Sequence, residues 1–314
     1  MSAHGILLID KPEGLRSRRA VDKAGRALGV RKVGHAGTLD PAATGLLILL
    51  IGEGTKLSPF LMGGDKRYRA TIRLGADTDT CDADGETIAE YDTSNLSAEQ
   101  VRKALASFRG KIEQVPPQVA AVKVGGRAAW RYARAGESVD LAPRTVTIHE
   151  LEVVRMELPD VEIELSCTKG TYVRAIARDL GQLLGVGGHL TAIRRIASDP
   201  WHIRDAVDFN EFLELPSDAQ RRCVVPLERA LPGIVSVRAG DDLARAVANG
   251  GRIMGEMLFG RIPNELRAGD LIQIVTPTRL AILRLIRDVQ ELGPAPWSGT
   301  EPVRYERVLH REHV

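Results

Sequence analysis

The stretch His35-Ala36-Gly37-Thr38-Leu39-Asp40-Pro41-Ala42-Ala43-Thr44-Gly45 places one carboxylate just before the apolar run of residues 46–51. That run predicts a buried strand or core segment, and a loop anchored to such a rigid element can hold a side chain with precision. Pro41 disfavours the helical region for Asp40. Three nearby glycines permit backbone angles that other residues avoid: Gly34, Gly37 and Gly45. Asp40 is therefore a candidate catalytic residue, and a solvated Asp-Pro turn is the alternative reading.

Length and pattern indicate two domains. A chain of 314 residues exceeds the size at which a single hydrophobic core stops growing. From about Leu231 the sequence changes to short apolar segments separated by Gly, Pro and Asp, at residues 271–275, 280–286 and 303–308. This pattern is typical of a small β-rich module. We expect one domain at residues 1–230 and a second at residues 231–314.

Positive charge is concentrated in two places, although the 43 Lys and Arg residues nearly balance the 41 Asp and Glu residues. The first basic stretch lies between residues 16 and 35 and contains only one acid, Asp22. Its cations are Arg16, Arg18, Arg19, Lys23, Arg26, Arg31 and Lys32. The second basic stretch contains two aromatic residues, Trp130 and Tyr132, among its cations. Those cations are Lys123, Arg127, Arg131 and Arg134. Such runs are often plain solvated faces, but aromatic residues between cations also suit phosphate contact with base stacking.

The sequence favours a cytoplasmic protein without a metal centre. Its three cysteines lie far apart and show no metal-ligand spacing. No apolar run approaches the roughly 20 residues that span a bilayer, and the N-terminus lacks the pattern of a signal peptide. The acidic segment 77–90 fails the calcium-loop spacing, which would put Thr80 and Tyr91 at ligand positions. We expect no metal and no cofactor, with Asp79 or Asp82 ordering nearby loops or arginines.

Local patterns predict the elements that carry the other polar residues. Ser17 can cap a helix that ends at Gly29 and exposes Arg18, Arg19, Lys23 and Arg26. Residues 67–74 alternate as a strand that turns Tyr68 inward. The strand at 161–167 leads into a helix that puts Arg174 in its first turn, where a cation is unfavourable for the helix dipole. A carboxylate partner for Arg174 would explain that position, and a surface arginine is the default alternative.

Four motifs in order resemble the TruB family of tRNA pseudouridine-55 synthases. They are residues 34–45, Asp65-Lys66-Arg67-Tyr68, the acidic segment from Asp77 to Gly85, and Lys169-Gly170-Thr171-Tyr172-Val173-Arg174. The likeness runs from about Gly5 to Trp201, and the tail is similar to the PUA module of RNA-modifying enzymes. The resemblance implies an α+β catalytic fold, with a large, mostly antiparallel sheet flanked by helices, and a small C-terminal β-barrel-like PUA module.

The resemblance also implies the reaction and the roles of several residues. Such enzymes isomerise a T-loop uridine of tRNA to pseudouridine, with no cofactor or obligatory protein partner, and this chain would act as a monomer. Asp40 would be the nucleophile, at the uracil ring or the sugar or by way of a glycal. Arg174 would pair with Asp40, and Tyr68 would stack on the target base. The expected substrate contacts are His35, Tyr172, Ile193, Lys11, Arg18, Arg19, Lys123, Arg127 and Arg131.

Base flipping and RNA gripping complete this expectation. Extruding a base costs a few kcal/mol of stacking, and His35 would fill the space that the base leaves. The segment 115–144 resembles the insertion that holds the T-arm. Arg16 and Val119-Ala120 depart from the spelling usual in the family, which concerns the RNA contacts. Two other functions stay open: a guide-RNA-dependent pseudouridine synthase, and a non-catalytic tRNA-binding protein or folding chaperone.

Overall fold

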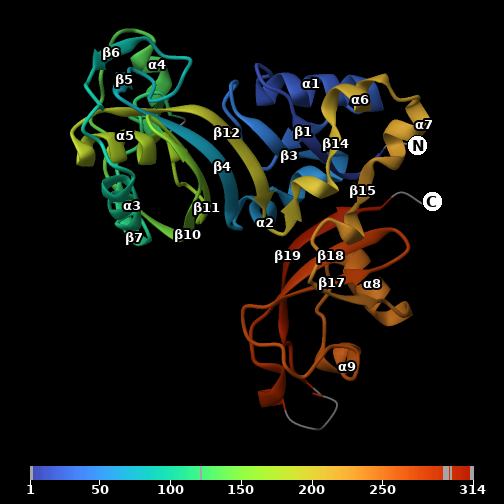
Figure 1. Ribbon diagram of the computed structural model, residues 1–314. Helices are drawn as coiled ribbons and strands as arrows, with labels where there is room; N and C mark the ends of the chain where they lie inside the picture. Colours follow the sequence, from blue (N-terminus) through green and yellow to red (C-terminus); the bar gives the residue numbers. More distant parts are fainter. Residues whose placement is uncertain (1–2, 121, 293–296, 298, 312–314) are drawn as a thin grey trace.

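A large mixed sheet organises the N-terminal two thirds of the chain in the computed structural model, which describes residues 3–120, 122–292, 297 and 299–311 (Figure 1). Its main path follows the order β14-β1-β3-β12-β4-β11-β10-β7 and is mostly antiparallel. The strands are β1 (Gly5–Lys11), β2 (Val33–His35), β3 (Thr44–Ile51), β4 (Lys66–Leu74), β7 (Gly110–Gln114), β10 (Arg144–Glu157), β11 (Asp160–Cys167), β12 (Gly188–Ser198), β13 (Trp201–His202), β14 (Val207–Asp208) and β15 (Val224–Pro226). The prediction of a large, mostly antiparallel sheet is confirmed.

The half of the sheet around β1 and β3 is covered on both faces. Residues 46–51 lie in β3 and are all buried, as their continuous apolar run predicts. Leu7, Ile9, Leu47 and Leu49 face α1 (Ser17–Leu28), α6 (Phe209–Glu214) and the chain before α7 (Ser217–Arg222). The opposite face meets α2 (Ser58–Met62) and part of the C-terminal module. The strand that follows Asp40 is therefore fixed from both sides.

The other half of the sheet is covered on one face only. Strands β4, β10 and β11 alternate, and their apolar residues pack on α3 (Ala98–Ala106) and α5 (Val173–Leu184). The inward set of β4 includes Tyr68, as its alternation predicts. Cross-strand ion pairs cover the outer face, and Arg73 donates to both carboxylate oxygens of Asp160 at 2.8 and 2.7 Å. The charged face of these strands is exposed to solvent. The pocket described below lies on the other face, which the helices cover.

The predicted helix boundaries hold, with one correction. Gly29 and Gly185 end α1 and α5 in the left-handed conformation, and Ser97 and Gln100 form a capping box at the start of α3. Ser17, however, does not cap α1, because its hydroxyl instead donates to Leu39 O and accepts from Leu39 N–H, both at 2.9 Å. Tertiary contact with the Asp40 loop replaces the local cap.

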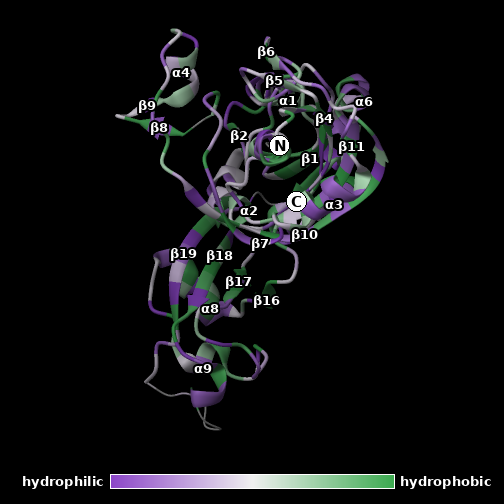
Figure 2. Cartoon of the chain, turned by 60° about the vertical axis from the view of Figure 1, so that its left-hand side comes forward, coloured by the Kyte–Doolittle hydropathy of each residue, from purple (hydrophilic) through white to green (hydrophobic). Residues whose placement is uncertain are grey.

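The segment 115–144 forms an arm that stands away from the sheet (Figure 2). It contains the two-stranded hairpin of β8 (Lys123–Val124) and β9 (Arg127–Ala128), followed by α4 (Ala129–Ala133). Gln118 closes the base of the arm with two hydrogen bonds to the backbone of Val139, each 3.0 Å long. A second hairpin, β5 (Ala76–Thr78) with β6 (Thr87–Glu90), carries the acidic segment.

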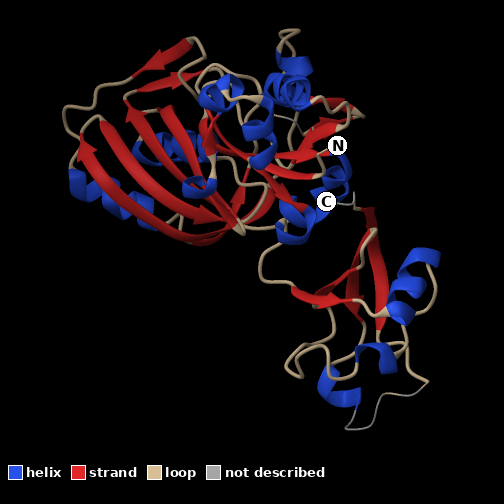
Figure 3. Ribbon diagram, turned by 90° about the vertical axis from the view of Figure 1, so that its right-hand side faces the viewer, coloured by secondary structure: helices blue, strands red, loops and turns tan. Residues whose placement is uncertain are grey.

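The C-terminal module is a four-stranded sheet in the order β16-β17-β18-β19 with two helices (Figure 3). These elements are β16 (Val235–Arg238), α8 (Asp241–Asn249), α9 (Gly255–Leu258), β17 (Leu271–Val275), β18 (Arg279–Leu285) and β19 (Val303–His310). The predicted β-rich module is present, and its described strands pair in an open order. Among all the described residues, no helix is long and apolar enough to cross a membrane.

Candidate active site

A pocket of about 900 Å³ opens where the loop before β3, the strands β4 and β12, the start of α5 and the base of the arm meet. Six residues expected at the site line it: Asp40, Tyr68, Tyr172, Arg174, Ile193 and Arg18. These six residues come from sequence positions as far apart as 18 and 193, so the sheet order brings them together. The lining contains seven cationic residues, and Asp40 is the acid among them.

The backbone around Asp40 is held at five consecutive carbonyl groups. Arg195 donates from Nη2 to Gly37 O at 3.3 Å and from Nη1 to Thr38 O at 3.2 Å. Ser17 binds Leu39 O, and Ala43 N–H donates to the carbonyl of Asp40 at 3.1 Å. The fifth carbonyl, on Pro41, accepts from Gly14 N–H at 2.9 Å and from the Lys11 ammonium at 3.0 Å. A loop satisfied in this way holds its side chain in one direction.

Gly45 is required by a close approach of two strands. It has a φ of +99°, and a Cβ there would lie 2.3 Å from Arg195 O on the neighbouring strand β12. Gly37 also has a positive φ, of +98°, whereas Gly34 does not, so the predicted freedom is used at two of the three glycines. The pairing of β12 with β3 through Gly45 is what brings the Arg195 side chain beneath the loop.

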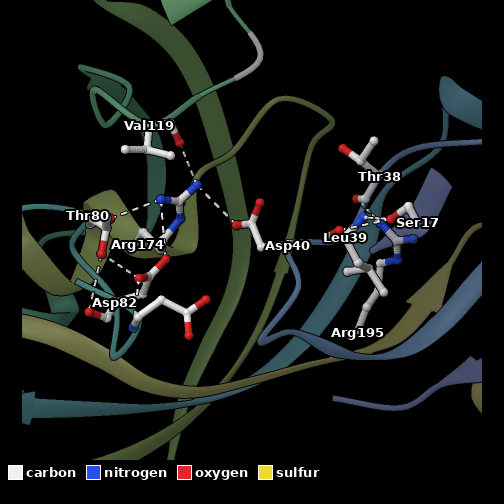
Figure 4. A network of polar contacts seen from close by, with 10 residues as sticks. Ser17, Thr38, Leu39, Asp40, Thr80, Asp82, Val119, Arg174 and Arg195 are labelled. Carbon is white, nitrogen blue, oxygen red and sulfur yellow. Dashed lines mark hydrogen bonds and ion pairs between the residues drawn. The ribbon is translucent and has the colours of Figure 1, made fainter. Parts of the chain in front are cut away.

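Arg174 pairs with Asp40 from a buried position (Figure 4). Its side chain is 8% exposed, while that of Asp40 is 51% exposed, and Arg174 Nη2 lies 3.0 Å from Asp40 Oδ2. Arg174 Nη1 lies 3.3 Å from Asp82 Oδ2, and the guanidinium also donates to Thr80 O at 2.9 Å and Val119 O at 2.8 Å. The predicted carboxylate partner of Arg174 and the ordering role of Asp82 are both present in the structure.

This network fixes the orientation of Arg174. A buried guanidinium that meets two carboxylates and two carbonyls has its donors satisfied in one plane. The unfavourable position of a cation in the first turn of α5 is thereby offset by the two acids. Asp40 is thus the exposed end of a buried charge network, with an oxygen open to the pocket.

Aromatic and aliphatic groups form the pocket wall beside Asp40. Burial raises the pKa of the Tyr68 hydroxyl, against the opposing effect of the Arg195 guanidinium. Burial likewise raises the pKa of Tyr172, whose backbone is fixed by two hydrogen bonds to the side chain of Gln114. Both phenols are therefore neutral at physiological pH. Ile193 adds an aliphatic surface, so the wall fits a flat and partly apolar group.

Two expected substrate contacts occupy other places. Lys11 is 0% exposed, and its ammonium donates to the carbonyls of Pro12, Leu15 and Pro41, so the expectation that it contacts substrate is wrong in this structure. All three of its donors are used inside the protein. His35 lies at the end of β2 outside the pocket lining, and its Nδ1 is buried without a hydrogen-bond partner among the described residues.

The remaining expected contacts are cations at the edges of the site. Arg19 lines a separate depression of about 680 Å³ along α1, together with Arg18, Arg26 and Arg31. Lys123, Arg127 and Arg131 lie on the arm and do not line the main pocket. These cations therefore lie on elements that border the pocket, and they do not contact Asp40.

Several lining residues are absent from the sequence expectations. Arg195 is the most buried of them, with 2% exposure, and it follows a register shift in β12 that hides it from alternation patterns. Arg16, Arg144, Lys169 and Trp130 also line the pocket. The basic stretches of the sequence contain Arg16 and Trp130, and Lys169 begins the family motif that ends at Arg174, but no sequence pattern indicates Arg144.

The arrangement suits covalent chemistry by a carboxylate on an anionic substrate. Asp40 is rigid, half-exposed and oriented by a guanidinium, as a carboxylate nucleophile requires. The surrounding cations attract phosphate, and the aromatic wall accepts a planar base. Among the described residues, no group of three or more metal-ligating side chains gathers.

Two family models match adjoining parts of the chain. Residues 25–173 match the TruB family pseudouridylate synthase N-terminal domain, and residues 174–232 match the tRNA pseudouridylate synthase B C-terminal domain. The first match contains Asp40 and Tyr68, and the second begins at Arg174.

Curated relatives agree with these matches, and a solved structure shares the fold. The chain is 38% identical to tRNA pseudouridine synthase B of Ralstonia pickettii over 98% of this chain and 94% of that protein. It is 47% identical to tRNA pseudouridine synthase B of Aromatoleum aromaticum over 71% of this chain and 72% of that protein. A chain in the crystal structure of a Cbf5-Nop10-Gar1 complex is similar in fold, with a TM-score of 0.73 and 24% identity over 98% of this chain and 85% of that chain.

Proposed function

The chain belongs to the TruB family of pseudouridylate synthases, and we propose that it acts alone on tRNA, converting uridine 55 of the T-loop to pseudouridine. Pseudouridine synthesis is an isomerisation: the bond between N1 of uracil and C1′ of the ribose breaks, and a bond between C5 and C1′ forms. The proton on C5 leaves, and N1 gains one. No group is consumed or released by the overall reaction.

The observation that carries this proposal is the pair of Asp40 and Arg174 in the pocket. Asp40 is the nucleophile, and its exposed oxygen can reach a uracil ring or a ribose carbon that enters the pocket. Arg174 orients the carboxylate, while Tyr68 stacks on the flipped uracil and Tyr172 and Ile193 hold its edges. Attack on the ring, attack on the sugar and formation of a glycal all use this one carboxylate.

RNA recognition is assigned to the surroundings of the pocket. The T-loop uridine leaves its stack to enter, and His35 takes the space that the base vacates. The unpaired Nδ1 of His35 supports this assignment, because a buried polar atom without a partner is costly and can be satisfied by RNA. The domain at 1–230 carries the reaction, the arm at 115–144 grips the T-arm, and the module at 231–314 binds RNA as a PUA-like domain.

The purified protein alone provides the test. It is incubated with an unmodified tRNA transcript and with a T-arm hairpin, and pseudouridine is then mapped by position. Modification of position 55 in both RNAs is expected. Product at another position would overturn the site assignment, and activity that appears only after a guide RNA and partner proteins are added would overturn the proposal of a stand-alone enzyme.

A further inference from the structure

Trp130 lines the pocket of Asp40, although it belongs to the arm. Its side chain is half-buried on α4. The other aromatic residue of the arm, Tyr132, is absent from the pocket lining and serves the fold of the arm itself: its hydroxyl donates to Val124 O at 3.3 Å, and the Arg127 guanidinium lies 4.4 Å from its ring centre. The two aromatic residues thus differ in place, and Trp130 alone of the pair faces the site.

Backbone contacts tie Trp130 to the catalytic network. Its N–H donates to Ala120 O at 3.1 Å, and the adjacent carbonyl, Val119 O, accepts from Arg174 at 2.8 Å. Ala120 and Ala129, on either side of this contact, are buried. The backbone of Trp130 is therefore anchored to the short segment of chain that Arg174 also contacts, and the Trp130 side chain lines the pocket.

Two guanidinium groups lie near the indole ring. Those of Arg131 and Arg134 are 5.3 and 5.0 Å from its centre, and both side chains belong to exposed residues. No acid occurs from Val119 to Ala135 to neutralise them. A cation–π contact at an exposed site is weak, whereas a charge-assisted hydrogen bond from arginine to phosphate is strong. Arriving RNA can therefore draw both arginines from the ring to its phosphates.

We infer that Trp130 stacks on an unpaired RNA base next to the target nucleotide, after Arg131 and Arg134 have moved from the ring to phosphates. This inference rests on the proposed function and adds a base-binding residue to it. Tyr68 packs against the core of the sheet and takes the target base, whereas Trp130 lines the pocket from the arm and meets a neighbouring base. A planar ring can stack on any base, and the contact therefore holds the RNA without reading its sequence.

Three substitutions separate stacking from simple apolar contact: Trp130→Phe, Trp130→Leu and Trp130→Ala. Phe keeps an aromatic face and Leu keeps apolar bulk alone. We expect the KM and Kd of a T-arm hairpin to rise at least about tenfold for Leu and Ala and to stay within about threefold for Phe, with kcat at saturating hairpin nearly unchanged. Equal constants for Leu and Phe would overturn the inference.

The fluorescence of Trp130 supplies a second readout. It should stay unchanged on RNA binding if Trp130 only supports the fold of the arm. The difference in emission between the wild type and Trp130→Phe isolates Trp130 from Trp201 and Trp297, which lie outside the pocket lining. Saturating hairpin should quench this difference signal, because a stacked base quenches indole emission, and an unchanged signal would overturn the inference. A wild type that binds the hairpin but forms no pseudouridine would instead overturn the proposed function, and the quenching would still decide the role of Trp130.

Discussion

Asp40 is a half-exposed carboxylate on a fully bonded loop, and this combination defines the site at the scale of single residues. Its backbone neighbours are bound by Arg195, Ser17 and Lys11, so the loop cannot turn the side chain away from the pocket. Arg174 fixes one oxygen from a buried position. A carboxylate oriented in this way suits the proposed role of nucleophile, because it does not need the general base that a hydroxyl nucleophile requires.

Asp40→Asn is expected to abolish pseudouridine formation while the hairpin still binds. The amide has the size of the carboxylate but lacks the negative charge and the nucleophilic oxygen, so the rate should fall by more than about 100-fold. Tritium release from hairpin labelled at uracil C5 measures the rate, and anisotropy measures binding. Asp84→Asn, which changes an exposed carboxylate of the acidic segment, is the matched control. A rate above about a hundredth of the wild type would argue against covalent catalysis by Asp40.

Lys11 makes the stability of the loop depend on pH. Burial lowers the pKa of Lys11 from 10.5 to about 8. Below that pH both the folded and the unfolded chain are protonated. Between about pH 8 and 10.5 the unfolded chain binds a proton that the folded protein has released, so the contribution of Lys11 to the free energy of unfolding rises with pH.

Comparison with Lys11→Met isolates this effect. Urea unfolding of both proteins at about pH 7.5 and about pH 10 should show the difference in unfolding free energy growing in favour of the wild type, by up to about 3 kcal/mol. Groups other than Lys11 cancel in the comparison. A difference that stays constant between the two pH values would mean that the pKa of Lys11 is ordinary in the folded protein.

At the scale of elements, the helix α1 and the arm both carry exposed cations. Arg18, Arg19 and Lys23 are exposed on α1, and Arg18 forms a solvent-exposed ion pair with Asp22. Such a pair contributes little to stability. On the arm, Lys123 and Arg131 are similarly exposed. Exposed cations on elements that border the pocket are available for phosphate contact.

Neutralising either set should weaken RNA binding and flatten its salt dependence. The two triple variants replace Arg18, Arg19 and Lys23, or Lys123, Arg127 and Arg131, by Gln. Each lost phosphate contact should remove roughly 0.7 to 0.9 from the slope of log K against log salt, while the rate at saturating RNA changes little. Anisotropy of a labelled T-arm over a salt series gives these slopes.

A control triple variant tests whether location matters. Arg102, Lys103 and Lys111 are exposed cations on α3 and β7, outside the pocket lining. Their replacement by Gln removes the same charge and should leave the slope close to that of the wild type. If all three triple variants give the same slope, general charge would govern binding, and α1 and the arm would have no special part.

At the scale of the whole molecule, the C-terminal module shares a core with the catalytic sheet. Leu280, Ile282 and Leu309 pack in one cluster with Ile6 and Ile48 of β1 and β3. The alternate residues of β18, including Leu283, face the module's own core. Because β3 follows the Asp40 loop directly, the module supports the strand on which the site is built.

Ile282→Ala should therefore destabilise the catalytic sheet as well as the module. Removing these fully buried methyl groups is expected to lower the free energy of unfolding by about 2–5 kcal/mol. Hydrogen exchange should increase in β1 and β3 as well as in β18. Leu283→Ala is the matched control and should act mainly on the module. Unchanged exchange in β1 and β3 of the Ile282 variant would show that the two parts unfold independently.

Most of the local structure could be predicted from the sequence by itself. The apolar run at 46–51, the alternation at 67–74 and the helix end at Gly29 are each signalled by residues close together in sequence. Such signals arise because side-chain periodicity and backbone preference act locally. Asp40 and Arg174 could also be identified from the sequence. Asp40 lies between glycines just before an apolar run, Arg174 is a cation in the first turn of a helix, and both belong to family motifs.

The tertiary structure alone decided which polar groups meet. Arg195 binds Thr38 O across 157 positions of sequence, Ser17 leaves its helix end for Leu39, and Lys11 turns inward to Pro41. None of these pairings has a local signal, because a buried polar side chain bonds whichever unsatisfied carbonyl the sheet order brings within reach. For Arg195, the parallel pairing of β12 with β3 and the register shifts in β12 determine which carbonyl groups lie within reach. The sequence by itself thus determined the candidate nucleophile, and the packing of distant strands determined the hydrogen bonds that hold it in place.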